Sequence, residues 1–468
     1  MVSTFTNCQT GSRILTSNTN VMKIVLCTHR FLPRFVGGVE IYTLRLAHAL
    51  QKQEHTVYIL TGEPTARKNL TVTVKEDDYK GTSVLRLQYD YEYRSIIHRA
   101  SYNDPLITAQ IRAILQRLQP DIVHATSFSL LMAGTIEATS SLNLPIIYTA
   151  TDFVLTCRRG IYLKKDNSIC TEKEEVARCT ACMGPQTQLE KLLTRVWQLT
   201  PQRLSHPLLS QIEQLIGKKA DFVHATPSIQ HRLNYLPALR QKIERIIAPS
   251  TYMRDMFVLN GFSPHKIIIS PYGVEMPMVN FKKTHSAKLR FGFIGRITFI
   301  KGIHLLLEAF IRLPEPDRVQ LTIYGGTDVK SGQYVRALQD KANQQSNINF
   351  AGFINNENIS QLYSQLDILI VPSIWPENSP ITILEAQAHN IPIIASDVKG
   401  IADLVQHEVN GLIFANHDID GLTSQITRCL DSPDLIARLS GKSRLTKSIQ
   451  EDVESVLKVY KEVLATKS

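Results

Sequence analysis

Two glutamates eight positions apart, Glu377 and Glu385, could bind the hydroxyl groups of a sugar or a ribose. A carboxylate suits this task because its two oxygens accept several hydrogen bonds. Asn378, Ser379 and Pro380 lie between them, and serine as N-cap with proline as first residue predicts a helix start here. The free N–H groups of such a start attract a phosphate. A capped helix with two surface glutamates is the alternative interpretation.

Two other apolar segments are followed by residues that could contact a ligand, namely a pair of cations and a pair of glycines. Gly295, Arg296 and Lys301 come directly after the segment 289–294, where the two cations could converge on a diphosphate. Two solvated surface cations would give the same pattern. Gly37 and Gly38 lie between an apolar segment and a helical one, where glycine lets the backbone approach a ligand closely. A plain tight turn explains these glycines equally well.

Apolar segments typical of buried strands alternate with segments of helical periodicity along the chain. This alternation predicts parallel sheets covered by helices on both faces. The pattern pauses near 276 and resumes at Leu289, so we expect an α/β protein with two doubly wound Rossmann-like domains. The expected divisions are a disordered tail 1–21, a first domain 22–275 with a cysteine-rich insertion at 157–182, a linker 276–288, a second domain 289–446, and a final helical segment 447–468 packing back on the first domain.

The composition is that of an ordinary globular protein. Of 468 residues, 43% are hydrophobic and 20% charged, and no apolar run is long enough to span a membrane. The net charge of +10 favours phosphate-bearing substrates at a membrane surface. Lysine and arginine are scattered and no nucleic-acid-binding motif is visible, so we expect no nucleic-acid partner. The polar first residues lack the apolar core of a signal peptide, which favours a cytoplasmic protein. The positive charge would suit peripheral contact with the inner face of the membrane.

Several of these motifs together resemble the retaining glycosyltransferases of family 4, which have the GT-B fold. The resemblance spans about 23–463. In the second half it is carried by GRITFIKG, PENSPITILEA and IPIIASDVKGIADLVQHEVNGLIF, and in the first half by FVGGVEIYTLRLAHAL and IIAPSTYMRDMFVLNGFSPHKIIISPYGVE. The glutamate pair is its most specific part. A GT-B fold implies two Rossmann-like domains that face a central cleft.

The resemblance implies a role for each motif residue. Arg296 and Lys301 would bind the donor diphosphate and replace a metal ion, so that catalysis needs no cofactor. Glu377 would hold the transferred sugar, and Glu385 would hold the ribose. The remaining expected donor-binding residues are Gly37, Gly38, Gly295, Asn378, Ser379 and Pro380.

The implied reaction moves a sugar from a nucleotide-sugar, with UDP or GDP as the nucleotide, to the hydroxyl of a glycan or lipid-linked acceptor. Polysaccharide or glycolipid assembly is the usual setting of the family. A nucleotide-sugar epimerase or phosphorylase on the same fold, and a catalytically silent homologue that binds nucleotide-sugar, remain open.

One position departs from the family pattern. At the end of the strand at 145–151, family members commonly have the sequence His-Asp-Phe. This chain has Thr151, Asp152 and Phe153 there. Asp152 is retained, and we expect it in the active site. Thr151 replaces a histidine that usually reaches the transferred sugar, so the departure bears on donor identity and rate.

Four of the seven cysteines are clustered in one polar segment of the first domain, at Cys157, Cys170, Cys179 and Cys182. Four thiolates with one C-x2-C pair suit a tetrahedral zinc ion, which would stabilise a loop with little apolar content. A subset of family 4 shows a similar cysteine loop. An iron–sulfur cluster, disulfides, and free thiols are the alternatives. Two amphipathic segments follow, at 189–199 and 208–216, which would either contact a membrane or acceptor or pack on the sheet.

Overall fold

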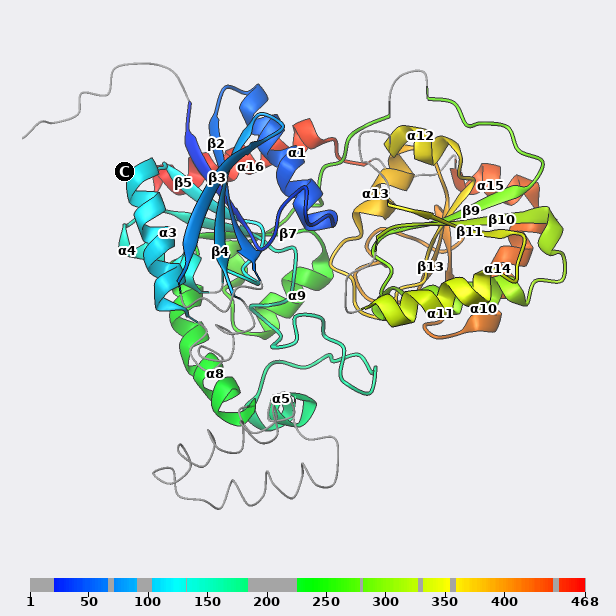
Figure 1. The fold of residues 1–468 in the computed structure, drawn as a ribbon, viewed down its shortest axis with the longest axis horizontal. Coiled ribbons are helices and arrows are strands. Elements are labelled where there is room, and N and C mark those ends of the chain that lie inside the picture. The colour runs from blue at the N-terminus through cyan, green and yellow to red at the C-terminus, as the bar shows by residue number, and fades with distance from the viewer. Residues whose placement is uncertain are drawn as a thin grey trace, which may run out of the picture.

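The structure is a computed structural model that describes residues 21–65, 71–90, 103–131, 133–183, 225–277, 281–326, 331–353, 359–440 and 446–467. The expected tail, except for Val21, and both amphipathic segments at 189–216 lie outside these residues. The described chain forms two α/β units, each built on its own sheet (Figure 1). No described helix has the length and apolar character needed to cross a membrane.

The first sheet has the strand order β3-β4-β2-β1-β5-β6-β7-β8 among the described residues. Alternate residues of β1 enter two different apolar clusters, because successive side chains of a strand point to opposite faces. Helices therefore cover both faces, as expected from the sequence. The strands are β1 Lys23–Thr28, β2 Thr56–Pro64, β3 Thr73–Tyr79, β4 Thr82–Tyr89, β5 Ile122–Ala125, β6 Ile146–Thr149, β7 Arg245–Ala248 and β8 Ile267–Ile269. The helices are α1 Gly38–Lys52, α3 Pro105–Leu118, α4 Gly134–Ser141, α5 Val176–Met183, α8 Ala225–Lys242 and α9 Thr251–Leu259.

The expectation of a wholly parallel first sheet is wrong at one edge. Strand β3 pairs antiparallel with β4. The two strands are joined by Lys80 and Gly81, both with positive φ, as a two-residue hairpin turn requires. The apolar pattern does not predict this hairpin, because β3 is mostly charged and only the glycine of the turn marks it locally.

The second sheet has the order β11-β10-β9-β12-β13-β14, and all its described pairings are parallel. This agrees with the parallel sheet expected for the second half. Its strands are β9 Leu289–Ile294, β10 Val319–Tyr324, β11 Ile348–Gly352, β12 Ile368–Val371, β13 Ile393–Ser396 and β14 Gly411–Phe414. Its helices are α10 Ile303–Ile311, α11 Gly332–Ala342, α12 Ile359–Ser364, α13 Ile381–Ala388, α14 Ile419–Asp431 and α15 Pro433–Ser440.

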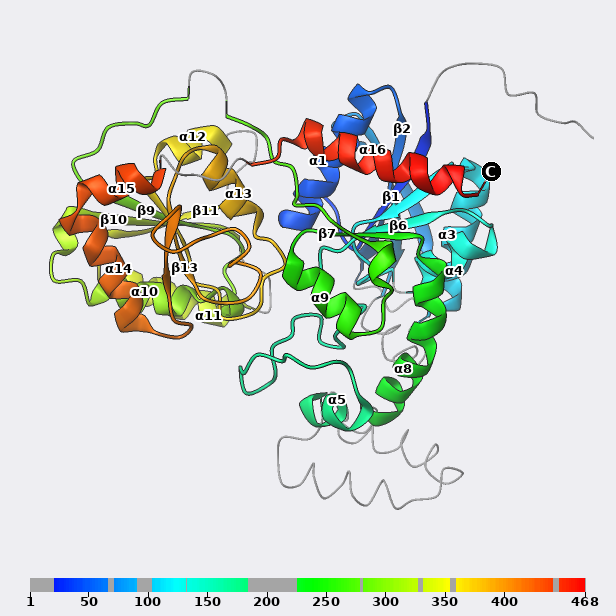
Figure 2. The same cartoon turned by 180° about the vertical axis from the view of Figure 1, so that it is seen from behind.

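The last helix, α16 (Ile449–Ala465), lies against α1 of the first unit (Figure 2). Ser448 begins it with a capping box, in which the Ser448 hydroxyl accepts from the Glu451 N–H and the Glu451 carboxylate accepts from the Ser448 N–H. The chain segment that enters α16 runs beside Val274, whose N–H donates to the Lys447 carbonyl at 3.0 Å. The two segments that connect the units therefore lie side by side.

A buried histidine joins α16 to the first sheet. His124 of β5 is fully buried, and its Nδ1 and Nε2 share hydrogen bonds of 2.7 Å with the hydroxyls of Tyr460 and Thr149. Burial lowers the pKa of His124 from 6.5 to about 3. The imidazole is therefore neutral in the folded protein at any pH above about 3.

We predict that this histidine makes the fold sensitive to mild acid. Between pH 6.5 and 3 the unfolded chain binds a proton at His124 that the folded chain does not, so stability falls as the pH falls through this window. The loss is about 1.4 kcal/mol per pH unit, or about 2 kcal/mol at pH 5. The fall in melting temperature from pH 7 to pH 5 should be smaller in His124→Gln than in the wild type. Equal falls would contradict the prediction.

Candidate functional site

Two loops of the second unit place a lysine beside a glutamate. One loop follows β9 and contains Lys301, and the other follows β12 and contains Glu377. Gly302 has φ +70°, and a Cβ there would lie only 1.8 Å from the carbonyl oxygen of Pro372. The Ile374 N–H also donates to the Ile300 carbonyl at 3.0 Å. The contact between the loops therefore depends on glycine, which tolerates both the left-handed backbone and the close approach.

The Glu377 carboxylate receives three donors on one oxygen. Lys301 Nζ lies 2.6 Å from Glu377 Oε1, and Ser373 Oγ and Trp375 Nε1 donate to the same atom at 2.5 and 3.0 Å. Lys301 Nζ also lies 5.4 Å from the centre of the Trp375 ring. Glu377 is only 2% exposed and the Lys301 side chain 23%, so the ion pair is partly buried. Such a pair holds a cation at a fixed place at the end of the sheet.

The backbone of Glu377 is fixed from a third loop. Its N–H donates to the Lys399 carbonyl at 2.9 Å. Gly400, with φ +84°, approaches so closely that a Cβ would lie 1.7 Å from the Glu377 carbonyl oxygen. The loops after β9, β12 and β13 therefore form one packed surface at the carboxyl ends of neighbouring parallel strands, where ligands of such sheets bind.

The helix start expected at Ser379 and Pro380 is wrong by one residue. Helix α13 begins at Ile381, and Pro380 occupies the N-cap position, which has no side-chain capping bond. The Ser379 hydroxyl is buried without a partner among the described residues. Asn378 Oδ1 accepts from the Ser379 N–H at 2.8 Å, and Pro380 has an extended backbone, so the helix begins only after it. Glu377 lies outside the helix and Glu385 inside it, as expected.

The carboxyl ends of the two sheets meet at this surface. Asn378 Nδ2 donates to the Thr151 carbonyl of the first unit. A Cβ on Gly37 would lie 4.0 Å from Arg296 Nε, and one on Gly38 would lie 3.4 Å from Ile381. The glycines predicted on one unit therefore face the arginine and helix predicted on the other.

Asp152 is held in one orientation at the end of β6. Ser127 Oγ donates to its Oδ2 at 2.5 Å, and Tyr148 OH and the Val154 N–H donate to its Oδ1 at 3.0 and 3.1 Å. The Thr151 hydroxyl donates to the Thr126 carbonyl. The Thr151 side chain therefore bonds within its own unit, and its carbonyl accepts from Asn378 of the other unit. Asp152 follows it beside the meeting edge of the two sheets.

His29 and Glu40 also lie at this edge, although they are not among the predicted site residues. His29 Nε2 lies 3.6 Å from Glu40 Oε1, and His29 Nδ1 is buried without a partner among the described residues. Burial lowers the pKa of His29; the carboxylates of Glu40 and Asp152 oppose this shift, and Arg296 adds to it. His29 directly follows β1, so the rule that sites follow strands could have found it.

Glu385 does not lie open to solvent in this structure. Arg45 of α1 donates from Nη1 to Glu385 Oε1 at 2.8 Å, and Tyr363 OH donates to Oε2 at 3.2 Å. The side chains of Arg45 and Glu385 are each 6% exposed. If Glu385 binds a ribose as expected, it must do so while two protein groups already donate to its carboxylate. One of these groups, Arg45, belongs to the other unit.

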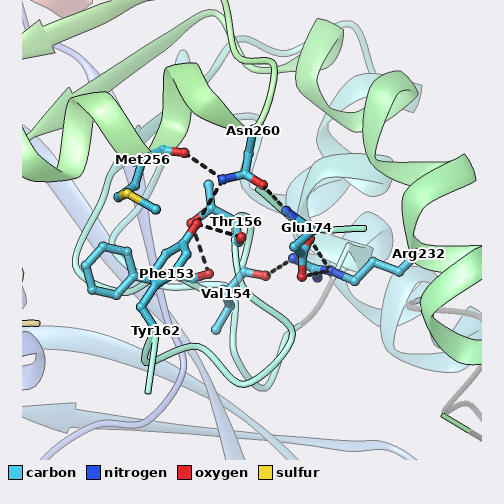
Figure 3. Close-up of polar contacts among 8 residues, drawn as sticks. All are labelled: Phe153, Val154, Thr156, Tyr162, Glu174, Arg232, Met256 and Asn260. Carbon is cyan, nitrogen blue, oxygen red and sulfur yellow. Dashed lines mark hydrogen bonds and ion pairs between the residues drawn. The ribbon is translucent and has the colours of Figure 1, made fainter. Parts of the chain in front are cut away.

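The loop that contains the cysteines is anchored to α8 and to the residue that follows α9 by buried polar groups (Figure 3). Arg232 Nε donates to both Glu174 oxygens at 2.9 and 2.8 Å, and Arg232 Nη2 donates to the Val154 carbonyl at 2.6 Å. Asn260 Nδ2 donates to Tyr162 OH at 2.9 Å, while Asn260 Oδ1 accepts from the Glu174 N–H. Helix α5 has no buried residues, so these bonds and the Phe153–Tyr162 ring contact hold much of the loop.

All four cysteines line one cavity of about 290 Å³ in this loop. Burial raises the pKa of Cys179 to about 11, and neighbouring Cys157 and Cys170 add to the shift. Within the described ranges, no three His, Cys, Asp or Glu side chains are arranged to hold a metal ion already. Four-thiolate ligation would require the loop to contract around the cavity, and zinc here remains a prediction.

We expect purified protein to carry about one zinc ion per chain, because four thiols that share a small cavity suit tetrahedral ligation. Replacing Cys179 and Cys182 by serine should remove the metal in elemental analysis. Cys429→Ala is the matched control, since Cys429 is buried in the second unit. Metal-free wild-type protein, prepared without chelators, would contradict the prediction.

Each half of the chain matches a glycosyltransferase family model. Residues 279–446 match the family model for glycosyl transferases group 1, and residues 36–226 match that for Glycosyltransferase Family 4. The uncharacterized glycosyltransferase MJ1607 of Methanocaldococcus jannaschii is 28% identical over 176 residues, which cover 37% of this chain and 44% of that protein. Amylovoran biosynthesis glycosyltransferase AmsK of Erwinia amylovora is 25% identical over 234 residues, covering 47% and 57%. The chain thus spans about half the length of these curated relatives.

Solved structures share the whole architecture. Alr3699/HepE of Anabaena, crystallised in complex with UDP and glucose, has a TM-score of 0.60 and 17% sequence identity, covering 95% of this chain and 99% of that one. At this identity the likeness shows the fold alone, and it confirms the GT-B fold expected from the sequence. The two family matches and the shared two-sheet architecture place the chain among GT-B proteins of the glycosyltransferase group 1 and family 4 type.

Proposed function

We propose that this protein is a retaining, metal-independent glycosyltransferase that moves a sugar from a nucleotide-sugar to an acceptor hydroxyl. The observation that carries the proposal is the Lys301–Glu377 pair, fixed by three loops at the meeting edge of the two sheets. Arg296 stands at the same edge, within 4.0 Å of the position of a Cβ on Gly37. Two cations at the strand ends suit a donor diphosphate.

In the proposed reaction, the acceptor oxygen forms a bond to the anomeric carbon while the bond from that carbon to the diphosphate breaks. The proton of the acceptor hydroxyl passes to the departing diphosphate. Arg296 and Lys301 stabilise the charge that develops on the leaving group, which is an electrostatic effect of the kind that can dominate catalysis. Glu377 holds Lys301 in place and accepts hydrogen bonds from hydroxyls of the transferred sugar. Asp152 faces the reacting groups from the first unit, across the edge where the two sheets meet.

The setting we propose is polysaccharide or glycolipid assembly, with a glycan or lipid-linked acceptor at the inner face of the membrane. Its support is the curated relative of Erwinia amylovora, which is a biosynthetic glycosyltransferase for amylovoran. UDP is the first donor nucleotide to test, because a protein of the same fold binds UDP and glucose in its crystal. A net charge of +10 favours phosphate-bearing substrates and anionic surfaces.

The test is a panel of UDP-, GDP- and ADP-sugars, screened first by thermal shift and then by release of free nucleotide in the presence of chelator. At least one donor should raise the melting temperature and be hydrolysed or transferred, and the product should keep the anomeric configuration of the donor. Inversion, or turnover abolished by chelator and restored by a divalent cation, would refute the mechanism. Conversion of the donor without nucleotide release would indicate an epimerase, and binding without turnover would indicate a silent homologue.

A further inference from the structure

A buried ion pair joins the two units at the glutamate that we assign to the donor ribose. Arg45 lies on α1 of the first unit and Glu385 on α13 of the second, and their side chains are 2.8 Å apart. Both are about nineteen-twentieths buried, so the pair is far less screened than an ion pair on the surface. The apolar residues of α1 and α13 belong to one cluster that continues across both units.

The two protein partners of Glu385 occupy only part of its hydrogen-bonding capacity. A carboxylate can accept about four hydrogen bonds, and Arg45 and Tyr363 supply one to each oxygen. Each oxygen therefore retains an acceptor position. Two neighbouring hydroxyls of a ribose could use both positions without displacing either partner.

We propose that Arg45 is a positioning residue for donor binding: from the opposite unit, it orients the Glu385 carboxylate to accept the ribose hydroxyls. This inference rests on the proposed function. It adds that Glu385 is oriented for the ribose only while the two units are in contact, because Arg45 and Glu385 lie on different units. A binding side chain that neighbouring groups already hold in one orientation loses less conformational entropy when the ligand binds. Arg45 thereby couples the closed arrangement of the units to recognition of a ribonucleotide.

A second feature of Arg45 agrees with a ligand at this place. Its Nη2 is buried and has no hydrogen-bond partner among the described residues. A buried donor without a partner is costly, and such groups are uncommon in folded proteins. Donor binding beside Glu385 would admit a polar group or an ordered water molecule that could accept from Nη2.

Arg45 also has an alternative partner when the units separate. Glu275, in the segment that connects the units, is half exposed and lies 3.8 Å from Arg45 Nε. Arg45 and Glu275 both line a cavity of about 410 Å³. Opening therefore does not leave the arginine as an isolated buried charge, which would be strongly destabilising.

The experiment measures how well the protein distinguishes a ribonucleotide from its 2′-deoxy counterpart. Calorimetric titration with UDP, GDP and ADP and with the matching 2′-deoxy diphosphates gives this preference directly. We expect the wild type to favour the ribonucleotide about ten-fold or more, as for a hydrogen bond to a charged group. In Arg45→Gln the preference should fall below about three-fold, with donor KM raised and kcat nearly unchanged, since uniform binding is lost.

Two further variants test whether Arg45 acts through Glu385. Glu385→Gln should lose the same preference, and the double variant should lose no more than Glu385→Gln alone, because the two residues form one unit. Arg45→Lys, which retains the charge without the forked geometry, should recover part of the preference.

Thr251→Ala is the matched control for a general effect on closure. Thr251 on α9 donates from its N–H and hydroxyl to Asp403 of the second unit at 2.7 and 2.6 Å, a contact that involves neither Arg45 nor Glu385. This variant should weaken contact between the units and leave the preference for the ribonucleotide unchanged.

The outcomes separate this inference from the proposed function. A wild type that binds nucleotides without preferring ribose, or an Arg45→Gln variant that keeps the preference or binds more tightly, overturns the role of Arg45 and leaves the proposed function standing. Equal losses in Arg45→Gln and Thr251→Ala would also overturn it in favour of closure alone. A wild type that binds none of the nucleotides refutes the proposed function and this inference together.

Discussion

Replacing Lys301 by alanine should lower kcat by about a hundred-fold or more with the correct donor. Its ammonium group is fixed at the meeting edge of the two sheets, through the ion pair with Glu377 and the contact with the Trp375 ring. A preplaced charge that answers charge on a leaving group acts mainly in the transition state, and the loss of one such group costs about 10²–10³ in kcat. The effect should therefore appear in kcat more than in KM.

The measurement must distinguish lost chemistry from lost stability. Removing Lys301 leaves the buried Glu377 carboxylate without its ion-pair partner, so we expect a lower melting temperature as well. Arg296→Ala should lower turnover to a similar degree with little loss of stability, because Arg296 is exposed. Lys341→Ala, at an exposed lysine 3.7 Å from Glu308, is the control and should retain activity. Wild-type turnover in folded Lys301→Ala protein would contradict the assignment.

The sequence predicts the two sheets well because burial leaves a local pattern. Strands such as Ile122–Ala125 and Ile368–Val371 are fully buried and apolar except for His124, as expected for strands covered on both faces. The β3–β4 hairpin at the edge of the first sheet leaves a weaker pattern, because β3 is mostly charged and only partly buried. Edge strands are the elements for which apolar periodicity is least informative.

Site contacts are harder to predict than site residues. Lys301 and Glu377 could be named from local motifs, but their ion pair joins residues 76 positions apart and depends on the close approach at Gly302. Arg45 and Glu385 are 340 positions apart, and nothing in the α1 sequence distinguishes a buried interdomain arginine from a surface one. Such contacts arise only when the two sheets meet.

The two glutamates that first indicated a sugar-binding site should differ when each is replaced by glutamine. Glu377→Gln should lower kcat by about ten-fold or more. Its carboxylate holds Lys301 and, in the proposed function, the sugar that gains positive charge during transfer, so its charge matters most in the transition state. Glutamine keeps the shape and can still accept from Ser373 and Trp375, which isolates the effect of charge.

Glu385→Gln should instead raise KM for the donor about ten-fold and leave kcat within about two-fold. The contact proposed for Glu385, with the ribose, is much the same before and during transfer, so its loss is a loss of uniform binding worth about 1–2 kcal/mol. Both variants should first be shown to be folded, because each removes the charge of a buried carboxylate from an ion pair. Steady-state kinetics with the true donor then compare the two. The proposal requires the charge of Glu377 to act on the transition state and the charge of Glu385 to act on donor binding. The roles assigned to this pair would therefore be wrong if both variants kept wild-type kcat and KM. They would also be wrong if Glu377→Gln changed only KM and Glu385→Gln changed only kcat.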